Sequence, residues 1–550
     1  MEDNNGLVTA QPEQTSPPSG GAPAQDNSRM KLDFKRTLFV GFAFMGIMCF
    51  WEVYDYIMPL ILNRVYGLDS TQYGLIMGLD NLLAIFLLPF FGHLSDKYTK
   101  AKYGRRTTFI FIGTLCAVVF MVVMILIENS QFEKVIAGGI TDPQTLIDGG
   151  YLDPEAWTEE IRSAWQQITD AGLAPDSLDS AAAIGLTGAG YEAYSDFLDV
   201  FFNAQYSMAW EVTKANPGII AGFIVALLLV LVAMASYRSP AIALMPDVTP
   251  KPLRSQANAL ITLMGGAGGL ASIILYTLLA KERYQSHIAL FVTLAAVMAV
   301  MLIAYLFTVR EKKFVQMRLD EEKRWGVVDE EEVASYEKLP KKKLLSLVLI
   351  LATVFMWFMG WNAIKSHLST YATDVLKFDD GFVGIINILN GAGGAIALLP
   401  VALLAAKLGR KRTILIGVVI AFCAFIPCIF LSDTIEQTLL KVAFTACFLI
   451  AGFGLVIINV NTLPMVTELA KGSNVGQYTG YYYVASMTAQ AITPFIAGLI
   501  MDANPGNENL IFVYGVCCIA VCFVTMFFTR HGDNKPEKKK KVIEYFGEED

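Results

Sequence analysis

The sequence predicts an all-α membrane protein with twelve transmembrane helices in two pseudo-symmetric six-helix bundles. Of its 550 residues, 54% are hydrophobic and only 17% are charged, a balance that argues against a set of soluble domains. The apolar residues form runs of about 20 residues or more, the length that an α-helix needs to cross the hydrocarbon of a bilayer. A charged segment separates the sixth run from the seventh, as expected between two related bundles.

Each apolar run is predicted to be one span. The runs cover residues 37–60, 71–92, 106–127, 217–243, 256–280, 287–309, 344–366, 381–406, 413–431, 438–464, 476–501 and 509–529. The predicted organisation is a disordered cytoplasmic tail at 1–36, an N-terminal bundle at 37–309 with an extracytoplasmic acidic loop at 128–217, a cytoplasmic linker at 310–343, a C-terminal bundle at 344–529 and a charged cytoplasmic tail at 530–550.

Basic residues predict how the chain is oriented. If the N-terminus lies inside, 33 of the 42 lysines and arginines fall in inside segments, and nine fall in outside segments or at outward helix ends. Because basic residues are retained on the cytoplasmic side, both termini are expected in the cytoplasm, with the chain a multi-pass protein of the plasma or cell inner membrane.

The overall negative charge resides in the loop at 128–217. This loop carries 15 acidic residues against three basic ones, a balance of −12, which leaves +4 for the rest of the chain. Asp153 and Pro154 are typical of an N-cap and a first helical position, and they predict an amphipathic helix whose apolar face holds Trp157, Ile161, Trp165 and Ile168. A solvated acidic loop with no function of its own and a vestibule that gathers cations are both consistent with this charge.

Enzyme and cofactor chemistry have no support in the sequence. The four histidines do not cluster, so no metal site is predicted, and neither a hydrolase constellation nor an ATP-binding motif is present. We therefore expect no catalytic residue, no cofactor and no nucleic-acid partner, with the energy for any transport supplied by a gradient.

Charged loops after the second and fourth spans predict an inner gate. Asp96 is expected to pair with Arg105 or Arg106, and Asp247 is expected to pair with Arg254, as latches that open reversibly. The alternative is that these basic residues only set the topology.

The same loops carry a resemblance to a known family. The stretch from Gly92 to Arg106, GHLSDKYTKAKYGRR, resembles the loop between the second and third helices of sucrose/proton symporters, which are major facilitator superfamily transporters, and of their animal solute-carrier relatives. Trp51-Glu52 and the segment from Ser239 to Asp247 extend the likeness, and glycoside-pentoside-hexuronide:cation symporters are similar more distantly. The resemblance implies a proton-driven sugar transporter.

Three positions depart from these families. Plant sucrose symporters have an arginine where this chain has Ile242, and Arg238 lies one helical turn earlier. Leu231 replaces the acidic residue of their fourth span, and Leu88 replaces the aspartate of the glycoside-pentoside-hexuronide symporters. The coupling sites of both families are therefore not matched at these positions.

Three carboxylates inside spans are the candidates for proton coupling. Glu52 and Asp55 are three residues apart in the first span and so share one helical face, while Asp80 lies in the second span. Ionisable groups in hydrocarbon are costly and therefore indicate function. Glu52 is predicted to carry the proton, with Asp55 or Asp80 assisting; the alternatives are an interfacial hydrogen bond for Asp55 and a structural pair of Asp80 with Lys365.

Polar and aromatic side chains inside spans are predicted to bind the substrate. A sugar requires hydrogen-bond partners for its hydroxyls and an aromatic surface for its ring. The candidates are Trp51, Asn81, Arg238, Trp361, Asn362, Asn387, Asn390, Asn459 and Gln490. Amides that only bridge helices are the alternative for each one.

The function predicted from these features is proton-coupled symport of a disaccharide or glucoside by alternating access of the two halves. The expected partners are a small molecule, a proton or other cation, and the bilayer. Two alternatives stay open: an exporter of organic cations or polyamines, which would suit the acidic groups, and a membrane receptor or scaffold without transport.

Overall fold

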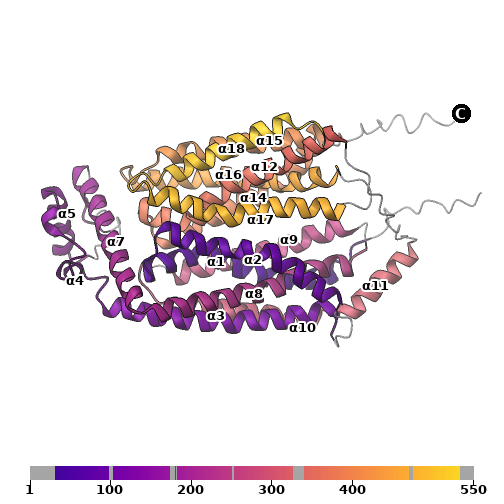
Figure 1. Ribbon diagram of the computed structural model, residues 1–550, viewed down its shortest axis with the longest axis horizontal. Helices are drawn as coiled ribbons and strands as arrows, with labels where there is room; N and C mark the ends of the chain where they lie inside the picture. Colours follow the sequence, from indigo (N-terminus) through magenta and orange to yellow (C-terminus); the bar gives the residue numbers. More distant parts are fainter. Residues whose placement is uncertain are drawn as a thin grey trace, which may run out of the picture.

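Two groups of long helices lie side by side in the computed structural model, which describes residues 31–97, 103–173, 180, 183–186, 188–250, 253–280, 282–325, 340–469 and 475–532 (Figure 1). Both predicted tails fall largely outside these residues. One end of the molecule carries the short helices α4 and α5, and the opposite end carries helix α11. We call the first end outer and the second inner, following the predicted orientation.

The N-terminal bundle consists of α1 (Phe34–Leu60), α2 (Ser70–Lys97), α3 (Arg105–Ala137), α8 (Pro217–Val248), α9 (Arg254–Leu279) and α10 (Ile288–Thr308). The C-terminal bundle consists of α12 (Lys341–Ser366), α14 (Asp380–Leu408), α15 (Arg410–Phe425), α16 (Gln437–Thr467), α17 (Val475–Asp502) and α18 (Leu510–Phe528). Eleven helices of the described part are long and apolar enough to cross a membrane, and α14, with 29 residues, is the twelfth helix of the fold. The predicted fold class is confirmed.

The first helix of each bundle ends in the same way, which shows the pseudo-symmetry directly. Helix α1 runs into the π-helical turn η2 (Ile61–Val65). Helix α12 is followed by the short helix α13 (Leu368–Thr370) and the π-helical turn η5 (Tyr371–Val375). Since π-turns are rare and often occur at functional sites, their repetition indicates that the outer ends of α1 and α12 are candidate functional regions.

The acidic loop folds into an outer subdomain of α4 (Pro143–Asp148), η3 (Pro154–Ala156), α5 (Glu159–Asp170) and α7 (Ala189–Ala215). Trp157, Ile161 and Ile168 are buried in its apolar core. The prediction of one helix capped by Asp153 was wrong in its start. Asp153 accepts a hydrogen bond from Glu155 N and caps only η3, because the backbone of Trp157 is extended, and Thr158 caps α5.

The linker forms helix α11 (Glu311–Arg324), which is tied to the inner end of the N-terminal bundle. The carboxylate of Glu311 accepts hydrogen bonds from Arg106 N at 3.1 Å and Thr107 N at 2.7 Å, and it thereby caps the otherwise unpaired N–H groups at the start of α3. Arg36 forms a bidentate pair with Glu321, 2.9 Å at its shorter bond. The part of the linker at 326–339 lies outside the described residues.

Candidate functional site

Helices α2 and α17 bring the two bundles together at the outer end. A Cβ on Gly78 would lie 2.2 Å from the carbonyl oxygen of Ala491, and a Cβ on Gly498 would lie 2.1 Å from that of Ser70. The carboxylate of Asp502 also accepts hydrogen bonds from the first backbone N–H groups of α2, including Ser70 N at 3.0 Å. Only glycine permits such close backbone approach, so the outer contact depends on the glycines at positions 78 and 498.

The same two helices separate toward the inner end. Pro89 lies eleven residues after Gly78 and Val484 lies seven before Ala491, so each shares the contact face of its helix. Yet Pro89 is exposed and Val484 is 57% exposed. The bundles are therefore in contact outside and apart inside, an inward-open arrangement.

A network of charges closes the outer end. Asp374, in η5 of the C-terminal bundle, receives Arg283 of the N-terminal bundle at 2.8 Å and Arg64 of η2 at 3.6 Å. Arg64 also donates to Thr373 Oγ1 at 2.8 Å. Burial would raise the pKa of Asp374, but the two guanidinium groups hold it below its ordinary value. The two π-turns thus meet through ionised groups.

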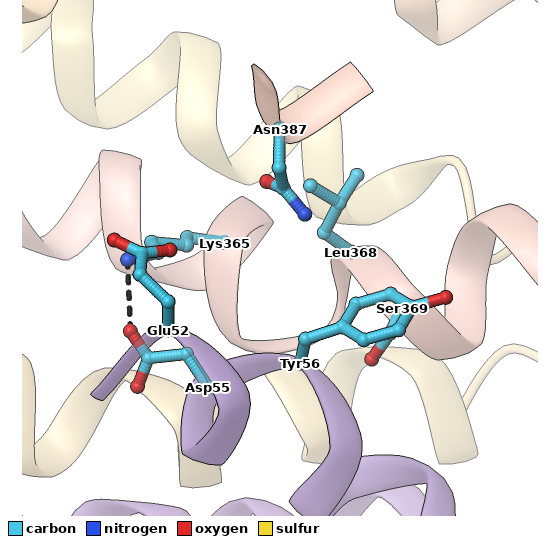
Figure 2. A pocket seen from close by; sticks show the side chains of 7 residues that line it. All are labelled: Glu52, Asp55, Tyr56, Lys365, Leu368, Ser369 and Asn387. Carbon is cyan, nitrogen blue, oxygen red and sulfur yellow. Dashed lines mark hydrogen bonds and ion pairs between the residues drawn. The ribbon is translucent and has the colours of Figure 1, made fainter. Parts of the chain in front are cut away.

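A pocket between α1 and the C-terminal bundle lies just below this closed end. It is lined by Glu52, Asp55, Tyr56, Lys365, Leu368, Ser369 and Asn387 (Figure 2). Lys365 Nζ lies 2.8 Å from Asp55 Oδ2, which makes this ion pair a contact between the two bundles. The alternative in which Asp80 pairs with Lys365 is not what the structure shows, because Lys365 faces α1 and bonds Asp55.

Glu52 shares this pocket and points toward the C-terminal bundle beside Lys365 (Figure 2). Its position follows from the three-residue spacing to Asp55 on α1. Helix α9 approaches it through Gly269, whose Cβ would lie 3.1 Å from Glu52 Cγ. Two carboxylates and one ammonium therefore meet where the bundles join.

A second pocket lies within the N-terminal bundle, where α1, α2 and α8 meet. It is lined by Trp51, Asp80, Leu83, Ala84, Leu88, Leu231, Ala235 and Arg238. The Arg238 guanidinium lies 5.6 Å from the centre of the Trp51 ring, within reach of a cation–π interaction. Asp80 Oδ1 accepts hydrogen bonds from Asn81 Nδ2 at 2.7 Å and from Asn81 N at 2.6 Å. The positions Leu231 and Leu88, which depart from the related families, make the apolar wall of this pocket.

The remaining substrate candidates are divided by the structure. Asn387 lines the first pocket and donates to Tyr276 Oη at 3.2 Å. Trp361 is almost fully buried and stacks on Trp357, with 5.9 Å between ring centres. Asn390 bridges α14 and α16, because its side-chain amide donates a hydrogen bond to Phe448 O at 2.7 Å.

Three further candidates lie outside both pockets. Asn362 donates to the backbone of Phe358 one turn earlier, and Gln490 donates to the backbone of Ser486 in the same way. Asn459 is exposed. None of the three lines either pocket, so their predicted role in binding has no geometric support here.

Ser369 lines the first pocket although it was not among the predicted candidates. Its Oγ and the indole Nε1 of Trp51, in the second pocket, are buried, and no hydrogen-bond partner is found for them in the described part of the chain. Buried polar groups without partners are uncommon and are suited to receive a ligand. Ser369 was missed because a lone serine after a span carries no signal in the sequence.

The inner latch differs in part from its prediction. Arg106 Nη2 lies 2.5 Å from Asp96 Oδ1, one of the two predicted pairings. The predicted pair of Asp247 with Arg254 was wrong. Asp247 Oδ2 instead bonds both Arg105 and Arg106 at 2.9 Å, and Arg254 donates to backbone carbonyls of its own loop. Asp96 and Asp247 therefore converge on Arg106 across α2, α3 and α8.

Comparisons with known proteins agree with this architecture. A family model described as Major Facilitator Superfamily matches residues 30–140, 201–463 and 376–546. A search of curated protein sequences finds no match.

Solved structures show the same fold at low sequence identity. The inward open conformation of the xylose transporter XylE from E. coli is 13% identical, with a TM-score of 0.55, over 93% of this chain and 97% of that one. A D-xylose-proton symporter is 12% identical, with a TM-score of 0.54, over 90% and 98%. A bacterial homologue of the iron transporter ferroportin in an inward-facing state is 12% identical, with a TM-score of 0.55, over 91% and 99%.

Proposed function

Since this chain belongs to the major facilitator superfamily and is a multi-pass secondary transporter rather than an enzyme, we propose that it carries a sugar together with protons by alternating access. The observation that supports the proposal most directly is the ion pair between Asp55 and Lys365, which joins the two bundles beside Glu52. A charge pair that must break when the bundles separate couples protonation to conformation.

In the proposed cycle, Glu52 accepts a proton from outside while the outer end is open. Its neutral form removes one of the two negative charges that face Lys365, so that Lys365 pairs with Asp55 alone as the bundles close outside. After closure the pocket is reached from the inner end, where the proton and the substrate leave. Asp80 assists from the second pocket, where Arg238 lies over Trp51.

Sugar as the substrate is supported by the lining of the two pockets. Trp51 offers a ring face, while Asn387 and the buried Ser369 hydroxyl offer hydrogen bonds. Lys365 and Arg238 also offset two of the three carboxylates, which favours a neutral substrate over an organic cation. The likeness to a D-xylose-proton symporter adds a weaker argument, from fold alone.

The inner latch and the orientation belong to the same proposal. Asp96 and Asp247 on Arg105 and Arg106 would hold the inner ends of α2, α3 and α8 as one block that moves together. We propose that this end, where the basic residues gather, faces the cytoplasm and that the membrane is a plasma or cell inner membrane.

Uptake into proteoliposomes tests the proposal. A panel of labelled mono- and disaccharides is offered with an imposed pH gradient and then with a sodium gradient. We expect accumulation of one sugar class driven by the proton gradient. No flux of any sugar, cation or polyamine would favour a receptor or scaffold, and flux of a polyamine alone would favour the exporter.

The role of Glu52 is tested by Glu52→Gln with Glu133→Gln as control, because Glu133 is exposed at the outer end of α3. The Glu52 variant should lose gradient-driven accumulation but keep exchange of internal for external sugar, since exchange requires no net proton release. Proton-driven accumulation at the parent level in Glu52→Gln would remove this residue from the mechanism.

A further inference from the structure

The outer subdomain contacts the C-terminal bundle although its chain belongs to the N-terminal half. Helix α7 rises from the outer end of the N-terminal bundle and continues into α8 through Asn216 (Figure 1). Its Asp199 pairs with Lys377, which lies two residues after η5 of the C-terminal bundle. Ser195, one turn earlier, donates a hydrogen bond to Asp433, beyond α15. Two contacts thus join α7 to the opposite half.

Phe202 on α7 lies between cations of both halves. The Arg283 guanidinium, from the loop between α9 and α10, lies 3.4 Å from the centre of its ring, and Lys377 Nζ lies 4.8 Å from it. Tyr206, one turn further along α7, accepts a hydrogen bond from Arg283. Since Arg283 also pairs with Asp374, α7 is connected to the charge network that closes the outer end.

Lys377 is held for this contact at a conformational cost. Its φ of 57° makes it the one non-glycine residue of the described chain in the left-handed region, which L-residues with a Cβ disfavour. Its side chain is 1% exposed, whereas that of Asp199 is 55% exposed. A buried ammonium on a strained backbone is maintained only where its partners stabilise it, and one of those partners comes from the other half.

We propose that the outer subdomain is a strap that holds the outer end closed, with Asp199, Ser195 and Phe202 of α7 seated on the C-terminal bundle. These contacts break when the bundles separate outside, because α7 is continuous with the N-terminal bundle. The free energy of these contacts therefore sets the ratio of inward-open to outward-open molecules. The strap requires alternating access but neither a sugar nor a proton, so its test needs no substrate.

Outside accessibility of one introduced cysteine tests the strap. Ser369→Cys places a thiol in the pocket below the closed outer end, where Ser369 is 2% exposed. Intact cells are treated with a membrane-impermeant maleimide, and the chain without Ser369→Cys gives the background from native cysteines. Adding Lys377→Gln should raise the labelling rate about 5- to 30-fold, the change that corresponds to losing one partly buried ionic contact.

A matched control exists within the C-terminal bundle. Lys441 pairs with Asp379 at 3.2 Å and lies 5.3 Å from the Phe382 ring, the same combination of groups as in the strap, but all three residues belong to the C-terminal half. Lys441→Gln should leave the labelling rate unchanged.

Two further variants keep the test decisive if Lys377→Gln is not inserted in the membrane. Asp199→Asn, on the exposed side of the contact, should also raise the rate, and the charge exchange Asp199→Lys with Lys377→Asp should return it toward the parent value. Parent-level labelling in both Asp199→Asn and Lys377→Gln would overturn the proposal, as would an equal increase in Lys441→Gln.

Discussion

Replacement of Asp55 by Asn should shift the molecule toward the outward-open state by a calculable amount. Lys365 Nζ and Asp55 Oδ2 are 2.8 Å apart, and the two side chains are 36% and 33% exposed. At this separation the Coulomb energy is about 1.5 kcal/mol in water and about 6 kcal/mol at an effective dielectric constant of 20. Because a third of each group is exposed, screening favours the lower part of this range, and we expect a net loss of about 1–2 kcal/mol. That loss corresponds to a roughly 5- to 30-fold change in the ratio of the two states.

A double-mutant cycle measured by electron spin resonance distances gives the coupling. Spin labels at Glu133→Cys and Asn507→Cys place one label on each half at the outer end, and both positions are exposed. Asp55→Asn and Lys365→Gln should each increase the population at the longer distance, and the combined variant should show little more than either alone. If the two effects simply add in the combined variant, the pair does not couple the bundles and the reasoning is refuted.

Three further predictions concern other contacts. Gly78→Ala should prevent outer closure and abolish transport, because its new methyl group would meet a backbone carbonyl of α17, while Gly218→Ala, at the exposed start of α8 with open space around it, should transport normally; uptake assays compare the two. Glu311→Gln should lower the thermal unfolding midpoint in detergent, because it weakens the cap on α3 by about 1 kcal/mol, and an unchanged midpoint would contradict the capping role. Burial and the charge of Asp433 raise the pKa of Asp196 above its ordinary 3.8, so closure outside binds protons, and acidifying the outside through that raised pKa should favour the closed state. This gain is lost as the pH rises. After correction for the thiolate fraction of the introduced thiol at each pH, the outside labelling rate should respond less to the same pH step in Asp196→Asn than in the parent chain.

Hydrophobic length and charge placement were sufficient to predict the bundles. A bilayer allows few solutions for an apolar run of some 20 residues, because each backbone N–H and C=O group must be satisfied within its own helix. The predicted spans therefore agree closely with the helices, and the differences lie at their ends. Helix α3, for instance, continues to Ala137 beyond the predicted end at 127, since its outer turns pack into the core of the outer subdomain.

Pairing of side chains was predicted less well, because it depends on how helices face one another. Sequence proximity suggested Arg254 as the partner of Asp247, but the packing of α3 against α8 brings Arg105 and Arg106 closer. Lys365 was considered as a structural partner for Asp80, yet it pairs with Asp55. The depth of a residue in the membrane follows from counting along its span. The direction that its side chain takes around the helix axis depends on which helices pack against each face.

By itself the sequence determined that this chain crosses a membrane as two related sets of six helices, and it identified the carboxylates whose burial demands a purpose. Only the tertiary structure decided which carboxylate meets which cation, that α2 and α17 touch outside but not inside, and that α7 reaches across to the other bundle. The physical reason is that the free energy of moving an apolar run out of water depends only on the residues of that run, so it follows from composition. An ion pair between Asp55 and Lys365 joins residues 310 positions apart and forms only when the bundles close.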